Sequence, residues 1–177
     1  MQNGKVGMNA SIFRFNGTNL LFGSVFAGSS RIVVVDPSAG VVTLAYDSAS
    51  RQPSLATYNG SPALNPVPGQ KALCWSAYSA DTRTAYLADG GVARLVEVDP
   101  FTGSSTVAIL NITQETNSTS GLLDLAVGGG TLFALSGVLG SVVVVDVSGG
   151  RGSMEVKQVL PSGVVPKSSQ GMAVLVR

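Results

Sequence analysis

The chain has 177 residues and a net charge of +1; 12% of its residues are charged and 45% are hydrophobic. Soluble domains carry about 25% charged residues, so much of this chain is expected to be buried or covered. Its 11 basic and 10 acidic side chains form no basic stripe, which argues against a nucleic-acid partner. Apolar runs such as Val142 to Val145 are far shorter than the roughly 20 residues of a membrane helix, so no membrane span is expected.

The absence of histidine excludes Ser-His-Asp and Cys-His catalysis, and any zinc site that needs imidazole. Cys74 is the single cysteine, so it cannot form a disulfide within the chain. The run Gly128 to Gly130 is interpreted as a hairpin turn and not as a phosphate loop. The sequence therefore predicts no metal site and no cofactor.

Three successive segments share one pattern of four strands. Each opening strand leads into a turn with residues that tolerate φ > 0, at Asn16-Gly17, at Asp81 and at Gly128 to Gly130. The second strands are predicted at Leu20 to Ala27, Thr84 to Asp89 and Thr131 to Ser136. The third strands are predicted to end at Asp36, Asp99 and Asp146. The fourth strands are predicted at Val41 to Asp47, Ser105 to Asn111 and Glu155 to Leu160. A long loop rich in Ser, Pro, Asn and Gly is expected from Ser48 to Gln70.

The spacing inside the three segments is nearly constant. An aromatic residue precedes the aspartate by 14 residues in the first segment (Phe22 to Asp36) and by 13 in the other two. The aspartates themselves are 63 and 47 residues apart, near the 40–50 residues of a propeller blade. The pattern therefore predicts a single all-β domain over residues 1–177: a partial β-propeller of about three four-stranded blades at 11–47, 72–111 and 122–160.

Two further elements belong to this prediction. In each segment a Val-Asp-x-x-x-Gly signature is expected to mark a strand end whose aspartate caps the next turn. The last segment, Gln170 to Arg177, is similar to the first strand of another unit and is predicted to be a closing strand that needs a partner sheet.

The stretch Cys74-Trp-Ser-Ala-Tyr-Ser-Ala-Asp-Thr-Arg-Thr-Ala-Tyr-Leu-Ala-Asp resembles a recurring blade opening of the lactonase-type seven-bladed β-propellers, which include 6-phosphogluconolactonase and fungal carboxymuconate cyclases. Leu122-Leu-Asp-Leu-Ala-Val-Gly-Gly-Gly-Thr-Leu-Phe looks like the next blade of that family, and Ser169-Gln-Gly-Met-Ala like its closing strand. The resemblance covers roughly residues 11 to 177 and the family's C-terminal three blades. It implies that four more blades and a secretion signal lie upstream.

Five residues are candidates for ligand binding in the channel of such a propeller. Asp124 is interpreted as a channel-lining acid or as a backbone cap. Trp75 stacks on a ligand or packs in the core, and Gln170 donates to a substrate oxygen or pairs with the backbone. Arg14 and Arg94 bind a carboxylate in a bidentate manner or lie on a solvated face. The catalytic residues stay unknown, because no residue here matches a catalytic motif of the family.

Two other side chains are expected to have no role in chemistry. Cys74 lacks a histidine base and is predicted to be an inert thiol. Glu97 alternates with Val96 and Val98, so its side chain is predicted to point to solvent.

Five N-x-S/T sequons begin at Asn9, Asn16, Asn59, Asn111 and Asn117. One interpretation is that a β-protein rich in Ser and Thr collects such triplets in its turns. The other is a glycosylated, secreted protein whose signal peptide is not present in this chain. We expect the second, with an extracellular location.

Three functional hypotheses follow. The first is a lactonase-like or muconate cycloisomerase-like propeller, inactive as this fragment and active in a full-length parent, which takes small lactones or sugar acids. The alternative is a non-catalytic secreted propeller that binds a small ligand or a protein partner. The third is a fragment without independent function, whose partners are the missing blades or a second copy of the chain, since three blades cannot close a ring.

Overall fold

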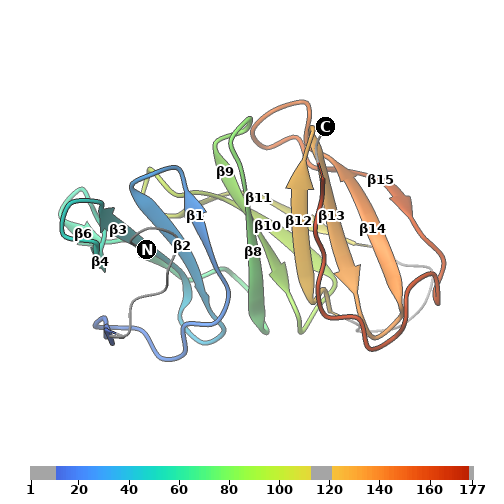
Figure 1. Cartoon of the computed structure of the whole chain (residues 1–177), viewed down its shortest axis with the longest axis horizontal. Helices are drawn as coiled ribbons and strands as arrows, with labels where there is room; N and C mark the ends of the chain where they lie inside the picture. The colour runs from blue at the N-terminus through green and yellow to red at the C-terminus, as the bar shows by residue number, and fades with distance from the viewer. Residues whose placement is uncertain (1–10, 113–120, 176–177) are drawn as a thin grey trace, which may run out of the picture.

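The structure, a computed structural model, describes residues 11–112 and 121–175 (Figure 1). In these two ranges every regular element is a β-strand, and no helix suited to crossing a membrane is found. The first sheet contains β1 (Ser24–Ala27), β2 (Arg31–Asp36), β3 (Gly40–Asp47), β4 (Gln52–Leu55) and β7 (Leu64–Asn65), and β5 (Thr57–Tyr58) pairs with β6 (Ser61–Pro62). The second contains β8 (Leu73–Ser79), β9 (Thr84–Asp89), β10 (Arg94–Asp99) and β11 (Ser105–Asn111), and the third β12 (Asp124–Gly128), β13 (Thr131–Ser136), β14 (Ser141–Asp146) and β15 (Glu155–Val159).

The three sheets stand in a row in chain order, each an antiparallel meander (Figure 1). The first strands of the sheets are neighbours, because β8 contacts both β1 and β12. These strands form the inner edge of the row, and the later strands of each sheet lie progressively further out. Three antiparallel units arranged in this way, the first of five strands and the other two of four, confirm the prediction of an all-β partial propeller.

Each gap between sheets is filled by an apolar core. Val33, Val35 and Val41 of the first sheet pack with Leu87 and Val96 of the second. The core between the second and third sheets contains Tyr86, Leu95, Leu125, Leu132, Val143 and Val145. The middle sheet is therefore apolar on both faces, which explains why β9 and β10 are buried along their whole length.

The first sheet corrects the predicted phase of the repeat. No strand precedes Asn16 in the described residues, and β1 is the first strand of the sheet, so Arg31–Asp36 is the second strand and not the third. The fourth strand comes from the expected loop: β4 and β7 both pair with β3, and the β5–β6 hairpin interrupts them. The sheet thus spans Ser24 to Asn65 instead of the predicted 11–47.

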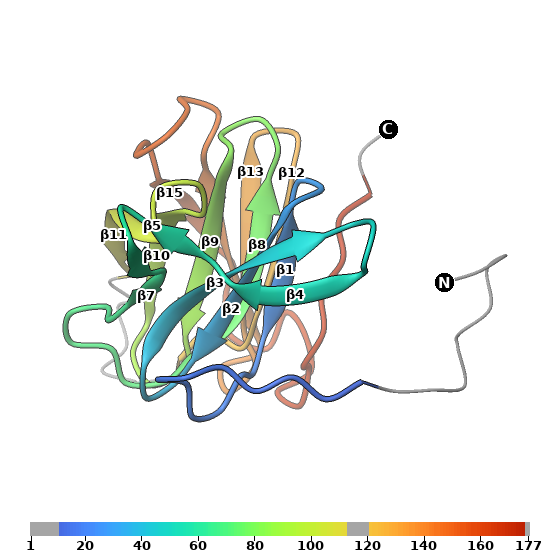
Figure 2. The same ribbon diagram turned by 90° about the vertical axis from the view of Figure 1, so that its left-hand side faces the viewer.

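The segment 11–21 runs along the lower edge of the first sheet in Figure 2 and packs on its outer face without forming a strand. Phe15 and Leu21 pack against the buried side chains of Val34, Val42 and Leu44. The backbone N–H groups of Asn19 and Leu20 donate to Oδ2 of Asp36 at 2.6 and 3.1 Å. Asp36 is therefore equivalent to Asp89, which ends the second strand of its sheet and accepts in the same way from the N–H groups of Lys71 and Ala72.

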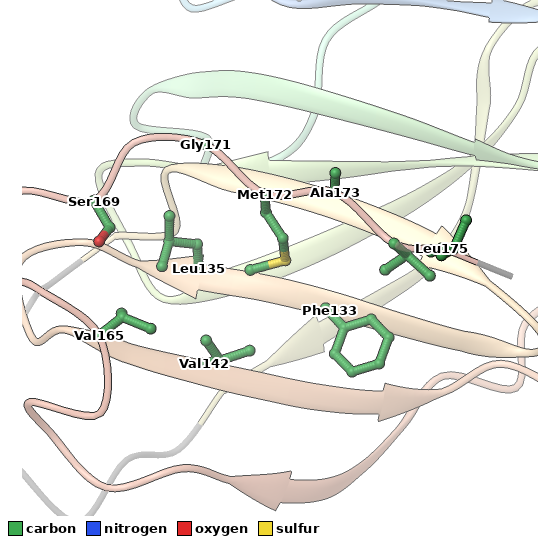
Figure 3. A pocket seen from close by; sticks show the side chains of 10 residues that line it. Phe133, Leu135, Val142, Val165, Ser169, Gly171, Met172, Ala173 and Leu175 are labelled. Atoms are coloured by element: carbon green, nitrogen blue, oxygen red, sulfur yellow. The ribbon is translucent and has the colours of Figure 1, made fainter.

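The predicted closing strand is also different in the structure. Residues 170–175 form no strand, and they run across the outer face of the third sheet, beside β12 and β13 (Figure 1). The backbone N–H of Met172 donates to Oδ2 of Asp124 at 2.6 Å. The side chain of Met172 points toward Leu135, in an apolar cavity of about 520 Å³ that Phe133 and Val142 also line (Figure 3). The segment is thus packed on the third sheet without forming a ladder with any strand of the described residues.

Asp36 makes the fold sensitive to acid. Burial raises the pKa of this carboxyl, but hydrogen bonds from Asn19, Ser38 and Ala39 outweigh it and lower the pKa from 3.8 to about 2. Since the ionised form is favoured in the fold, Asp36 contributes up to about 2 kcal/mol above the unfolded pKa of about 3.9, and this contribution is lost as the pH falls from there through about 2. We expect the difference in free energy of unfolding between the wild type and Asp36→Asn, measured with urea, to shrink below about pH 4. A difference that stays constant down to about pH 2 would contradict this assignment.

Candidate functional site at the inner rim

Five side chains from four parts of the chain line one cavity of about 210 Å³ at the inner edge of the sheets; they are Phe22, Cys74, Trp75, Leu123 and Gln170. We call this the inner-rim cavity. Phe22 and Leu123 occupy equivalent places, because each donates its backbone N–H to the neighbouring strand just ahead of β1 or β12, to Val35 O at 2.9 Å and to Leu135 O at 2.8 Å. The cavity therefore lies where the inner strands begin.

A β-bulge shapes the middle of this cavity. The register of β8 against β9 shifts between Leu73 and Trp75, which leaves Cys74 as the extra residue. Bulges of this kind redirect side chains and are frequent beside functional sites. Trp75 is half-buried and meets Phe22 edge to face, with the ring centroids 5.7 Å apart. The two rings form an aromatic corner with an open side, as a stacking platform requires.

The residue directly before β1 has to be glycine, because the backbone of β8 lies very close to it. A Cβ atom on Gly23 would collide with the backbone of Cys74, so only glycine lets β1 and β8 approach this closely at the cavity.

The thiol of Cys74 has no nucleophilic character in this position. It donates to the carbonyl of Ala72 at 2.9 Å. Burial raises the pKa of the Cys74 thiol, a hydrogen bond from Gly90 lowers it, and the nearby Asp89 carboxylate raises it again, with a net upward shift. The thiol is thus protonated at neutral pH, as the prediction of an inert cysteine requires.

Asp124 and Gln170 are two further candidates from the sequence, and they differ in how their side chains are held. Oδ1 of Asp124 accepts from the N–H of Leu125 at 2.8 Å, and Oδ2 accepts from Met172. The carboxylate therefore fastens the C-terminal segment to β12. Gln170 is exposed, and its side chain faces the cavity.

The two candidate arginines lie away from the inner-rim cavity. Arg94 is buried, and its Nη2 and Nε donate to Oδ2 of Asp89 at 3.0 and 3.2 Å, while Nη1 donates to the carbonyl of Pro68 at 3.0 Å. It does bind a carboxylate, but one that belongs to the chain itself. Arg14 is exposed in the segment that crosses the first sheet.

Glu97 corrects another prediction, since its side chain is fully buried and does not point to solvent. Oε1 accepts from the hydroxyl of Thr84 at 2.8 Å, and Oε2 accepts from the N–H of Gly152 at 3.0 Å. The alternation with Val96 and Val98 does place these residues on opposite faces. In the middle sheet, however, both faces meet a neighbouring sheet.

Phe22 and Leu123 are cavity residues that the sequence did not reveal. The sequence pattern predicts Phe22 in a second strand, as it does Tyr86. In the structure Phe22 instead precedes β1, the first strand of its sheet. An aromatic residue directly before Gly23 was the available signal.

The sequon asparagines that the structure describes are Asn16, Asn59 and Asn111, and all three are exposed, as a glycosylated side chain would have to be. Asn9 and Asn117 lie outside the described residues. Across 11–112 and 121–175, no group of three or more Cys, Asp or Glu side chains is arranged to hold a metal ion.

No protein-family model matches the chain, and no curated protein matches it in sequence. The solved structures of similar fold include chains of two protein complexes. A chain of a nidogen/laminin complex aligns with 75% of this chain at 10% identity and a TM-score of 0.50, and a chain of a mitotic checkpoint complex aligns with 97% at 12% identity and a TM-score of 0.52. Both neighbours have propeller-type folds, and the alignments cover 43% and 49% of them. The chain thus has the fold of part of a β-propeller and spans about half the length of these two solved structures.

Proposed function

We propose that this chain is a non-catalytic recognition module, and that its inner-rim cavity binds a compact ligand or an inserted side chain of a partner. The observation that carries the proposal is how the polar groups are used. The carboxylates of Asp89, Asp124 and Glu97 are all engaged in hydrogen bonds that hold the fold, whereas Trp75 and Gln170 face the cavity. An aromatic surface with one amide suits binding by stacking and a single hydrogen bond.

The dimensions limit what can bind. Sites for drug-sized ligands measure roughly 300–1,000 Å³, whereas this cavity measures about 210 Å³. A single sugar-like ring or one side chain of a partner is therefore the appropriate size. The lining is mostly apolar apart from Gln170 and Cys74, which favours a ligand that presents a flat carbon face to Trp75.

Trp75 is the single tryptophan of the chain, so its fluorescence reports on this cavity alone. We expect glucono-1,5-lactone or gluconate, titrated into the purified chain, to change the intensity or wavelength of this emission in a saturable way. Gln170→Ala should weaken the apparent affinity by about 10-fold, since it removes the one side-chain amide. Asn16→Ala, at an exposed turn away from the cavity, is the matched control and should leave the titration unchanged.

Lactone hydrolysis is the second candidate, and the same experiment separates it from binding alone. It is favoured by the resemblance to the lactonase-type propellers. The base for this reaction would be the half-buried carboxylate of Asp124, which follows the cavity residue Leu123 and accepts from the N–H groups of Leu125 and Met172. Hydrolysis of glucono-1,5-lactone above the spontaneous rate, lost in Asp124→Asn while the fold is retained, would support catalysis and contradict the recognition proposal. Saturable binding without turnover would support recognition.

A further inference from the structure

A second cavity of about 210 Å³ is formed by two turns of the second sheet and one loop of the third, and we call it the arginine cavity. It is lined by Thr82 and Arg83 of the β8–β9 turn, Asp99 and Phe101 of the β10–β11 turn, and Arg151 of the β14–β15 loop. The β8–β9 turn and the β14–β15 loop meet at the top of the row of sheets in Figure 1. Trp75 of the inner-rim cavity lies near the start of β8, whereas the β8–β9 turn follows its end, so the two cavities are separate.

The guanidinium of Arg83 is held in place but is not neutralised. Its Cζ atom lies over the ring of Phe101, 5.3 Å from the centroid, within the distance of a cation–π contact. Across residues 11–112 and 121–175, no carboxylate forms an ion pair with Arg83. The aromatic ring therefore holds a positive charge whose N–H groups are available to a ligand.

Phe101 departs from the turn signature of the other two sheets. In those sheets the second residue after the aspartate is a serine, Ser38 or Ser148, whose hydroxyl donates to the aspartate at 2.7 or 2.6 Å. Phe101 keeps only the backbone bond, from its N–H to Oδ1 of Asp99 at 2.7 Å. The second sheet thus lacks one hydrogen bond of the signature and has an aromatic ring in the cavity instead.

Arg151 supplies the second guanidinium of the arginine cavity. Its Nη1 lies 2.6 Å from Oδ2 of Asp99, and half of its side chain is exposed. The lining therefore carries two positive charges and one negative charge. Of the carboxylates close in sequence, Glu97 is fully buried with both oxygens hydrogen-bonded, and Asp81 is exposed to solvent, which screens its charge. One positive charge, that of Arg83, is left for a ligand to balance.

We propose that the arginine cavity binds a carboxylate group that carries a short apolar chain. A planar guanidinium donates two parallel N–H groups to the two oxygens of a carboxylate, and the ring of Phe101 offers apolar surface to the chain. A carboxylate has the single negative charge that balances the lining, whereas a phosphate group carries between one and a half and two. Both a free monocarboxylate and the glutamate side chain of a partner protein have this chemistry. The inference goes beyond the proposed function and does not depend on it.

Titration of the purified chain with butyrate at constant ionic strength tests this proposal. Proton–nitrogen correlation NMR should show saturable shifts of the N–H signals of Arg83, Phe101 and Gly152, with a midpoint on the order of 1–10 mM, because a partly exposed ion pair contributes little free energy. Butanol has the same chain length without the charge and should not shift these signals. Inorganic phosphate should bind with a midpoint several-fold higher than that of butyrate.

Arg83→Gly is the decisive variant. It should raise the butyrate midpoint by about 10-fold or more, since it removes the uncompensated charge. The fold should persist, because Arg83 has a φ of 57°, which favours glycine, and Gly130 has a φ of 74° in the equivalent place before β13. Arg51→Gly is the matched control and should leave the titration unchanged: Arg51 is exposed in the first sheet, has a φ of 59° and directly precedes β4. Far-UV circular dichroism establishes that both variants keep their strands.

A pair of blocked peptides distinguishes the two sources of the carboxylate. The pair is acetyl-glycyl-glutamyl-glycine amide and its glutamine counterpart. A midpoint for the glutamate peptide about 10-fold below that of butyrate would assign the site to a side chain of a partner, and a midpoint equal or higher would assign it to a free carboxylate. The glutamine peptide should not bind in either case.

Three results would overturn the proposal. They are the absence of saturable shifts with both butyrate and the glutamate peptide, unchanged binding by Arg83→Gly, and tighter binding of phosphate than of butyrate. The emission of Trp75 reports on the inner-rim cavity and enters none of these measurements, so the two proposals fail independently.

Discussion

Replacing Asp89 with alanine should lower the free energy of unfolding by about 3–5 kcal/mol. Both oxygens of this fully buried carboxylate are occupied. Oδ1 accepts from the N–H groups of Ala72 and Gly91 at 2.8 and 3.1 Å, and Oδ2 accepts from Lys71 N–H and from Arg94. Alanine would leave the buried guanidinium of Arg94 without its counter-charge, which is more costly than the loss of an exposed ion pair.

Urea denaturation followed by circular dichroism measures this effect. Asp81→Ala is the matched control, because Asp81 is an exposed carboxylate in the β8–β9 turn of the same sheet, and it should change the free energy of unfolding by no more than about 0.5 kcal/mol. If Asp89→Ala unfolded at the same urea concentration as the control, the buried ion pair would not be a principal support of the middle sheet.

Replacing Glu97 with alanine should cost about 3 kcal/mol, because the change removes a fully buried carboxylate that accepts two hydrogen bonds. The donors are the hydroxyl of Thr84 in the second sheet and the backbone N–H of Gly152 in the loop between β14 and β15, so the second bond joins the third sheet to the second. A nearby ion pair between Arg151 and Asp99, with 2.6 Å between Nη1 and Oδ2, fastens the same loop. The loss of Glu97 therefore weakens the junction between these sheets as well as the middle sheet.

Glu97→Gln is the informative comparison for this position. Glutamine keeps the volume and one acceptor oxygen, but its NH₂ group would face a donor, so its loss of stability should lie between those of the wild type and Glu97→Ala. The free energy of unfolding from denaturant titration gives the order. Equal losses for glutamine and alanine would show that Glu97 acts by its charge and not through these two hydrogen bonds.

The three Val-Asp-x-x-x-Gly signatures predict the local turn correctly but not the position of the preceding strand in its sheet. Asp36, Asp99 and Asp146 each accept from a backbone N–H two residues later, so the local inference of a strand followed by a capped turn is confirmed. The same signature nevertheless ends the second strand in the first sheet and the third strand in the other two. A turn motif specifies its own residues but not which strand of the sheet precedes it.

The site was harder to predict than the sheets. Trp75 and Gln170 were predicted as candidates from their places near strand starts, and the structure does bring them to one cavity. That finding concerns position, and their role in binding stays a prediction. Arg94 and Glu97 show why the rest could not be foreseen: their partners are Asp89 and Gly152, and the Gly152 contact depends on how neighbouring sheets pack.

The linear order of the sheets has a consequence for cooperativity. Each sheet packs only against its immediate neighbours. The end sheets of such an array can therefore unfold locally while the middle sheet stays folded. The inner-rim cavity draws residues from the first sheet, the last sheet and the C-terminal segment, and fraying at either end would dismantle it before the middle sheet melts. A ligand that binds only the intact cavity would therefore stabilise all three sheets against unfolding, by mass action.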